Sequence, residues 1–218
     1  MGYVLNIFTG VCLGTACCAL SGLIERHLSK KRGLSTESTK IMKVMTYVFS
    51  VICGICIMLF MPSTLMAVYA FILLVLAEIS GVMDIRHRII PNETVIALMA
   101  VKAVFIVLSL LGLRDAPKVD ILSSLIGFAA CFIIFLLPSF FGKNVGSGDI
   151  KLAAAIGFCL GFKGAFTAVA LMGGLVLIYM FLRPRVPVMA MIKKTIPMGP
   201  FLSAGMVAVC ILTGYGLI

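Results

Sequence analysis

Apolar residues dominate the chain in long runs that are separated by short polar segments. Each run is compared with the roughly 20 apolar residues that a helix needs to cross the hydrocarbon core of a bilayer. The candidate spans are residues 3–24, 44–61, 64–83, 93–112, 121–141, 151–161 with its flanks, 165–182 and 198–217. The pattern predicts an all-α, polytopic integral membrane protein with about eight transmembrane helices, forming a single membrane-embedded domain over residues 1–218.

The sixth run is the weakest of these candidate spans. Residues 151–182 are compatible with one long helix, with a short helix followed by a full one, or with a re-entrant segment. The segment Gly161-Phe-Lys-Gly164 favours a turn, because a lone Lys between glycines suits a membrane interface better than the bilayer midplane.

Composition narrows the class of protein. The chain has 218 residues, of which 62% are hydrophobic and 12% are charged, and its net charge is +10. A soluble domain carries about 25% charged residues. These values exclude an ordinary soluble enzyme, a disordered chain and a nucleic-acid-binding module, so we expect membrane lipids and no nucleic acid around the protein.

The basic residues set the expected orientation. Most of the 18 Lys and Arg lie in four loops that alternate along the chain, at 25–43, 84–92, 142–151 and 183–197. The opposite side holds Arg114, Lys118 and Lys163. The positive-inside rule therefore places the four loops in the cytoplasm and both termini outside, in a cytoplasmic (inner) membrane. The loop 25–43, with Glu25 and Glu37, is expected to be a solvated basic segment near anionic lipid.

The eight cysteines give no metal site by their spacing. Cys53 and Cys56 form a CxxC pair inside an apolar run, and no second pair completes a four-thiolate zinc site. We therefore interpret the cysteines as small packing residues, and expect no metal and no cofactor.

Two acidic residues carry the strongest chemical hypothesis. Asp84 ends the third run and Asp149 precedes the sixth, so both are predicted at the basic, cytoplasmic boundary. Two carboxylates that share a site do not both ionise easily, so one holds a proton. The protonated group then polarises a peptide carbonyl while the other takes a proton from water, which is the chemistry of aspartic proteases. Asp149 is expected near a helix N-terminus and Asp84 near a C-terminus, which favours Asp149 as the base and Asp84 as the acid.

Residues around the two acids fit such a site. Gly146 and Gly148 allow a sharp turn and a close approach of substrate backbone, while Arg86, Arg88 and Lys151 are expected to hold the site at the interface. The alternative is structural: Asp149 caps a helix, and Asp84 pairs with Arg86 or Arg88.

Two further acids have interpretations of their own. Asn92 is expected as an N-cap, with Glu93 in the first turn of the fourth helix. Glu78 lies nearly two turns deeper than Asp84. It is either a functional intramembrane acid or a protonated Glu that is hydrogen-bonded between helices.

Two segments of this chain resemble the type IV prepilin peptidase family. They read Asp84-Ile-Arg-His-Arg-Ile-Ile-Pro-Asn92 and Gly146-Ser-Gly-Asp-Ile-Lys-Leu152, and the family motifs are D-x-[RK]-x-x-x-I-P-N and G-x-G-D-x-K-[LM]. The later Ile196-Pro-Met-Gly-Pro-Phe201 resembles the P-x-G-P-F entry to the last helix of the family.

The resemblance implies an aspartic endopeptidase of the GxGD type. Such enzymes remove the short basic leader of type IV-like prepilins at the cytoplasmic membrane face. It implies Asp84 and Asp149 as the catalytic pair, with Gly146 and Gly148 in the GxGD motif. It also implies supporting roles for Pro91, Asn92 and Lys151.

The chain departs from many bacterial members in one segment. Those members carry two zinc-binding CxxC pairs after the first helix and methylate the new N-terminus with S-adenosylmethionine. Here the loop 25–43 contains no Cys, so we expect a short, peptidase-only form. The competing hypotheses are a transporter, in which Glu78, Asp84 and Asp149 bind a coupling ion, and a non-catalytic pilus assembly factor.

Overall fold

A computed structural model describes residues 2–112, 119–140, 146–182 and 197–214, with the side chain of Ser139 left aside. Every element within these ranges is a helix, which confirms the predicted fold class. The helices are α1 (Gly2–Lys31), α2 (Lys40–Phe60), α3 (Thr64–His87), α4 (Asn92–Leu110), α5 (Ile121–Phe140), α6 (Ser147–Phe181) and α8 (Gly199–Gly214). Six of them, α1 to α6, are long and apolar enough to cross a membrane, and α8 is shorter.

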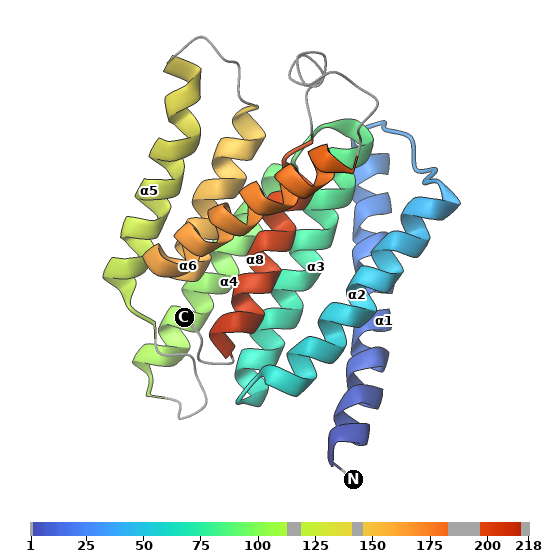
Figure 1. Cartoon of the computed structure of the whole chain (residues 1–218), viewed down its shortest axis with the longest axis vertical. Coiled ribbons are helices and arrows are strands. Elements are labelled where there is room, and N and C mark those ends of the chain that lie inside the picture. The colour runs from blue at the N-terminus through green and yellow to red at the C-terminus, as the bar shows by residue number, and fades with distance from the viewer. Residues whose placement is uncertain (1, 113–118, 141–145, 183–196, 215–218) are drawn as a thin grey trace.

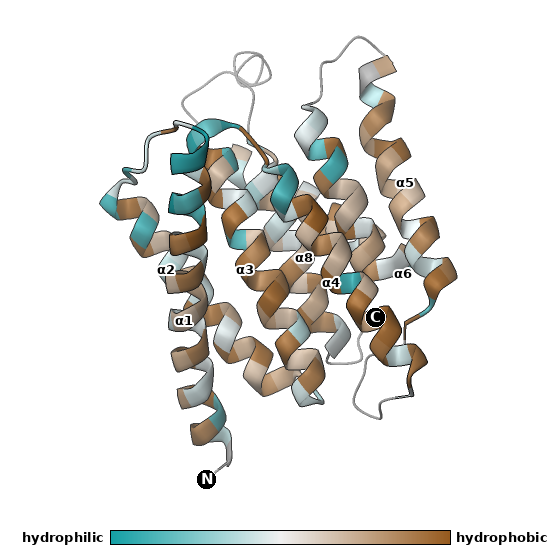
Figure 2. Cartoon of the chain, turned by 180° about the vertical axis from the view of Figure 1, so that it is seen from behind, coloured by the Kyte–Doolittle hydropathy of each residue, from teal (hydrophilic) through white to brown (hydrophobic). Residues whose placement is uncertain are grey.

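The helices alternate in direction and collect their polar residues at one end of the bundle (Figure 1). Figure 2 shows hydrophilic residues at the end of α1, the start of α2 and the end of α3, whereas the middle of the bundle is apolar. The opposite end holds the start of α1 and the end of α8. This arrangement agrees with the predicted alternation of loops. Arg114, Lys118, Lys143 and the basic residues of 183–196 lie outside the described residues.

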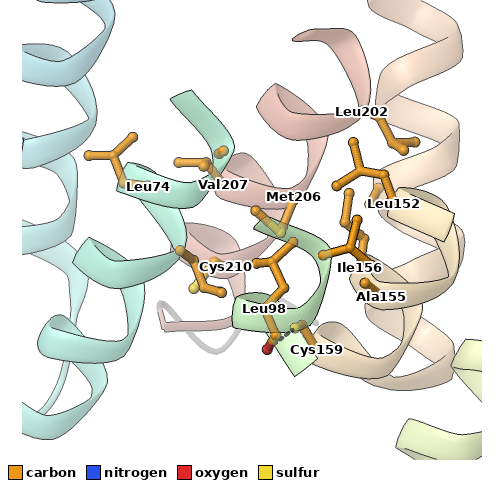
Figure 3. Packing of buried hydrophobic residues seen from close by; sticks show 14 of the residues in the cluster. Leu74, Leu98, Leu152, Ala155, Ile156, Cys159, Leu202, Met206, Val207 and Cys210 are labelled. Carbon is orange, nitrogen blue, oxygen red and sulfur yellow. Dashed lines mark hydrogen bonds between the residues drawn. The ribbon is translucent and has the colours of Figure 1, made fainter. Parts of the chain in front are cut away.

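Helix α3 lies at the centre of the bundle and is the most buried span. It packs against α1, α2, α4 and α8, and α6 closes the other side of α4 and α8. Leu98, Leu152 and Met206 are fully buried where α4, α6 and α8 meet (Figure 3). Lipid tails are as apolar as leucine, so this packing is stabilised by close van der Waals contact and hydrogen bonds rather than by removal from water.

Small residues allow the closest helix contacts. A Cβ atom added at Gly54 of α2 would lie 2.5 Å from the Gly10 carbonyl oxygen of α1, and one added at Gly127 of α5 would lie 2.5 Å from the Gly157 oxygen of α6. Backbones that approach this closely leave no room for larger residues, which is typical of helix interfaces in membranes.

Helix α6 is broken at Gly161, where φ is 73° and ψ is 179°, a conformation that glycine adopts without strain. The two arms diverge from this break, and the far end of each points toward the polar end of the bundle (Figure 1). At 1.5 Å per residue the first arm, 147–160, is about 21 Å long, shorter than the roughly 30 Å hydrocarbon core. The predicted turn at 161–164 is therefore present, and it separates a short arm from a full-length one.

Partners from neighbouring helices satisfy the backbone around the break. The Phe162 N–H donates to Oγ of Ser123 in α5 at 3.1 Å. On the other side, the Cys159 carbonyl accepts from Lys102 Nζ at 2.9 Å and from the Tyr69 hydroxyl at 3.1 Å. Buried carbonyls without an intrahelical partner need such donors in a membrane.

The helices extend further at the polar end than predicted. Helix α1 continues through Lys31, so residues 25–31 are helical and Glu25 is buried instead of solvated. Helix α2 already begins at Lys40, and α3 continues to His87. The N-cap of α4 is Pro91, and Asn92 is already its first residue. All of these differences lie at helix ends, which local sequence predicts least well.

Candidate active site

Asp84 lies in the last turn of α3 and is 6% exposed. Its Oδ2 accepts a hydrogen bond from the backbone N–H of Gly199, the first residue of α8, at 2.8 Å. A Cβ atom on Gly199 would lie 2.8 Å from both Cβ and Oδ2 of Asp84. The start of α8 therefore fits against the Asp84 carboxyl only because residue 199 is glycine.

Asp149 lies in the first turn of α6 and is half-buried. Its backbone N–H donates to the carbonyl of Gly146, the N-cap, at 3.0 Å, and its Oδ2 lies 3.1 Å from the place of a Gly146 Cβ. Its Oδ1 is buried and has no hydrogen-bond partner among the described residues. The helix start thus presents a carboxyl group with one oxygen left for a further partner.

The two motif segments lie side by side. A Cβ on Gly148 would be 3.1 Å from Ile90 Cβ, and Lys151 Nζ donates to Asn92 Oδ1 at 3.4 Å. These contacts bring the segments that carry Asp84 and Asp149 together at the polar end of the bundle. Carboxyl groups that share a site titrate as a pair, which is the arrangement that the sequence predicts for these two residues.

The positions of the two acids on their helices match the sequence prediction, but their surroundings do not separate their roles. Asp149 lies at a helix N-terminus and Asp84 at a helix C-terminus, as expected. Asp84 also receives the N–H of Gly199 at the N-terminus of α8, and the charge of Arg88 acts on it. Helix ends therefore no longer distinguish an acid from a base, and we treat the two residues as one pair.

Arg86 binds away from the pair. It forms a buried ion pair with Glu25 of α1, in which the side chains are 6% and 7% exposed. Its second nitrogen donates to the carbonyls of Ser35 at 2.7 Å and Glu37 at 2.8 Å. Instead of holding the site at the interface, Arg86 ties the last turn of α3 to α1 and to the segment that follows α1.

A second ion pair fastens the other side of the 84–92 segment. Glu93 lies in the first turn of α4, and its carboxylate is 2.5 Å from Arg32 and 3.9 Å from Lys31 at the end of α1. The end of α1 therefore contacts both the helix that carries Asp84 and the helix that follows Pro91, which is itself buried.

The sequence of α1 contains a polar pattern that indicates its contact with α3, although the surrounding apolar run makes this pattern hard to recognise. Ser21, Glu25 and Ser29 recur every four residues and so share one helix face. In the structure all three are buried. Ser29 donates to Glu25 at 3.1 Å, and Ser21 donates to Glu78 at 2.6 Å. This polar stripe faces α3.

Glu78 lies deeper in the bundle and does not belong to the Asp pair. It is 4% exposed and accepts hydrogen bonds from Ser21 of α1 and Ser50 of α2. Of the two sequence interpretations, these contacts favour an acid that links three helices. Lys102, which the sequence left without a role, is also buried and binds the Cys159 carbonyl beside the break in α6.

Comparison with known proteins gives one match. The sequence pattern of the type IV leader peptidase family matches residues 67–181, more than half of the chain. The chain belongs to this family. Its membership supports a peptidase of the aspartic-type family with a prepilin-type substrate, and the apolar helices agree with a membrane-bound member. No curated protein and no solved structure matches the chain.

The leader peptidase match covers both Asp84 and Asp149 but stops short of two contacts that fix the site. Glu25, the partner of Arg86, and Gly199, the donor to Asp84, lie on either side of residues 67–181. Among the described residues, no three His, Cys, Asp or Glu side chains are grouped so that they could hold a metal ion.

Proposed function

We propose that this leader peptidase is a membrane aspartic endopeptidase that cleaves the leader from type IV-like prepilins. In this proposal Asp84 and Asp149 activate water at the cytoplasmic face of the inner membrane. The observation that carries it is the placement of the two motifs: Asp84 and Asp149 lie at helix ends far apart in sequence, and contacts between their segments bring them together at the polar end of an apolar bundle.

The chemistry follows from one proton shared by the pair. One carboxylate accepts a proton from a water molecule, whose oxygen attacks the carbonyl carbon of the scissile peptide bond. The other carboxyl group donates its proton to the carbonyl oxygen, which gives a neutral tetrahedral intermediate. The carbon–nitrogen bond then breaks as the nitrogen takes the proton that the first carboxylate accepted from water, and one hydroxyl of the intermediate returns its proton to the other carboxylate. The leader leaves with a new carboxyl terminus, and the pair again holds one proton.

The environments of the two carboxyl groups suit this chemistry without assigning the acid and the base. The Gly199 N–H holds one oxygen of Asp84 in place, while Oδ1 of Asp149 is buried and open to a further partner. Such an oxygen is suited to bind the water or the substrate carbonyl. Gly146 adds no side chain beside Oδ2 of Asp149, which leaves room there for an extended substrate strand, whereas Gly148 makes room for Ile90.

We further propose that residues 1–218 act as one membrane-embedded peptidase domain. The contacts of Glu25 and Gly199 join segments on both sides of the family match to the Asp84 helix. The orientation with the pair facing the cytoplasm rests on the excess of basic residues at the polar end. A peptidase-only activity, without methyl transfer, is proposed because the segment after α1 lacks the cysteine pairs found in many members.

The test is cleavage of a candidate prepilin co-expressed with the wild-type chain, followed by mass spectrometry of the product. The proposal predicts a product shortened at the leader junction with a free, unmethylated amine, and none with the doubly substituted Asp84→Asn, Asp149→Asn chain at equal membrane level. Cleavage that persists in the doubly substituted chain would contradict the aspartic mechanism. A methylated product would contradict the peptidase-only form.

A further inference from the structure

A groove lies between α1 and α2 at the polar end, apart from the Asp pair. The two helices cross closely where Gly10 and Gly14 of α1 meet α2. Toward the polar end they diverge and are joined by the 32–39 segment (Figures 1 and 2). The resulting cavity has a volume of about 590 Å³, within the usual range of small-ligand sites.

The groove is lined by both apolar and polar residues. Leu23 of α1, Val44 of α2 and Val82 of α3 are apolar lining residues, and Thr36 and Ser38 of the segment between α1 and α2 are polar ones. Leu23 and Val44 are 63% and 61% exposed, so part of the apolar lining is open at the surface of the bundle. An occupant with a polar head and a long apolar tail fits this division.

The charge of the residues that line the groove determines whether an anionic or a cationic head group binds there. Arg26 and Lys43 line the groove, and neither takes part in the salt bridges of the described residues. Of the two acids in the lining, Glu25 is neutralised by its buried pair with Arg86. Glu78 accepts hydrogen bonds from Ser21 and Ser50, and even when ionised its single negative charge is outnumbered by the two positive charges. The uncompensated charge is therefore positive.

We propose that this groove is a binding site for an anionic phospholipid, with the phosphate held by Arg26 and Lys43 and an acyl chain between α1 and α2. Basic pockets between helices at a membrane interface bind anionic head groups. The same charges repel a basic leader peptide, so this groove and the proposed substrate site are different places. Because Glu25 forms part of the wall, the lipid lies beside the contact that holds the last turn of α3.

The test compares lipid binding by the purified full-length chain, read by native mass spectrometry during titration with phosphatidylglycerol or with phosphatidylcholine of the same acyl chains. The wild type is expected to bind phosphatidylglycerol more tightly. The double variant Arg26→Ala, Lys43→Ala is expected to lose about 10-fold or more of that affinity. The matched control Lys30→Ala, Lys40→Ala removes two exposed cations outside the groove and is expected to bind like the wild type.

A second variant tests the cavity without changing charge. Gly22 lines the groove, and a Cβ there meets no atom within 4 Å, so Gly22→Leu adds a side chain at the groove without a clash at its Cβ. It is expected to weaken phosphatidylglycerol binding. Gly173→Leu, at an equally open position of α6, is expected to have no effect.

Three results would overturn the proposal. They are equal affinity for the two lipids, an equal loss in both charge variants, and unchanged binding by Gly22→Leu. An equal loss in both charge variants would show that the lipid is attracted only by the general surface charge. None of these readings depends on whether the chain cleaves a prepilin.

Discussion

The two carboxyl groups of the candidate pair are held in different ways. The Asp84 end of α3 is fastened by the Gly199 N–H, by the buried Arg86–Glu25 ion pair and, across the following turn, by the Glu93–Arg32 pair. The Asp149 end of α6 has a glycine N-cap without a side-chain hydrogen bond, and Oδ1 of Asp149 has no partner among the described residues.

This difference suggests that the Asp84 carboxyl group is fixed in position, whereas the Asp149 carboxyl group receives a new hydrogen bond when water or substrate binds. A carboxyl group on a helix end that several contacts hold keeps its position at little further cost when substrate arrives, which is the advantage of preorganisation. A carboxyl group with a free, buried oxygen gains a hydrogen bond when water or substrate binds. We therefore expect changes around Asp84 to be more damaging than changes of comparable size around Asp149.

The largest effect is expected from Gly199→Ala. The new Cβ would lie 2.8 Å from Asp84 Oδ2, so the carboxyl group and the start of α8 must move apart. Misplacement of a catalytic group by about 1 Å costs about 100-fold in rate, and we expect a loss of that order in prepilin cleavage at equal protein level. The control is Gly174→Ala, where a Cβ meets no atom within 4 Å. Near-normal cleavage by Gly199→Ala would show that the Gly199 contact does not position Asp84.

The next largest effect is expected from breaking the buried ion pair of α1, and it is compared with the effect of breaking the exposed one. Glu25→Gln leaves the buried Arg86 charge unpaired, which is expected to cost about 3–5 kcal/mol of unfolding free energy. Arg32→Ala breaks the pair with Glu93, whose side chains are 27% and 43% exposed, and is expected to cost less than about 1 kcal/mol. Unfolding of the purified proteins by denaturant in detergent measures both. Equal losses would contradict the expectation that the buried Glu25–Arg86 pair contributes more to stability than the exposed Arg32–Glu93 pair.

A smaller effect is expected at the break in α6. Lys102→Met removes one of two side-chain donors to the Cys159 carbonyl and leaves the Tyr69 hydroxyl in place. We expect a loss of about 1–2 kcal/mol of unfolding free energy, measured in the same denaturant titration. Lys163→Met, at an exposed position just beyond the break, is the control and should change stability by less than about 0.5 kcal/mol.

The smallest effect is expected from the contact between Lys151 and Asn92. Both residues are exposed, and their hydrogen bond is long at 3.4 Å. Lys151→Ala and Asn92→Ala should each lower the cleavage rate by no more than about threefold, and the double variant should resemble either single one. A much larger loss from Lys151→Ala would show that Lys151 contacts the substrate directly.

The sequence predicted the helices well because the bilayer imposes a length and a composition on each span. It also indicated the turn near Gly161, since a lone Lys between glycines is costly inside a span. The end of α1 and the start of α4 were both missed, and for α1 the reason is physical. Glu25 stays helical and buried because Arg86, 61 positions along the chain, neutralises it, and no local pattern reports such a partner.

The candidate site, like the helix ends, was predictable from the sequence only in part. Asp84 and Asp149 were found because two motifs stand at the same predicted depth, and the structure brings their segments together. The sequence analysis singled out the segment that contains Gly199, but the residue pattern does not show that the Gly199 backbone N–H donates to Asp84. The sequence predicted that Arg86 holds the site at the interface, and in the structure its guanidinium forms an ion pair with Glu25 of α1. Their catalytic roles remain a prediction of this account.

The most direct test of the account measures kcat/KM for prepilin cleavage by the purified wild type, Asp84→Asn, Asp149→Asn and the doubly substituted chain. If the two acids act as one pair, each single change lowers kcat/KM by more than about 10³-fold, and the double change is hardly worse than either. Substantial cleavage by either single variant, or losses that multiply in the double variant, would contradict the claim that Asp84 and Asp149 share one catalytic task.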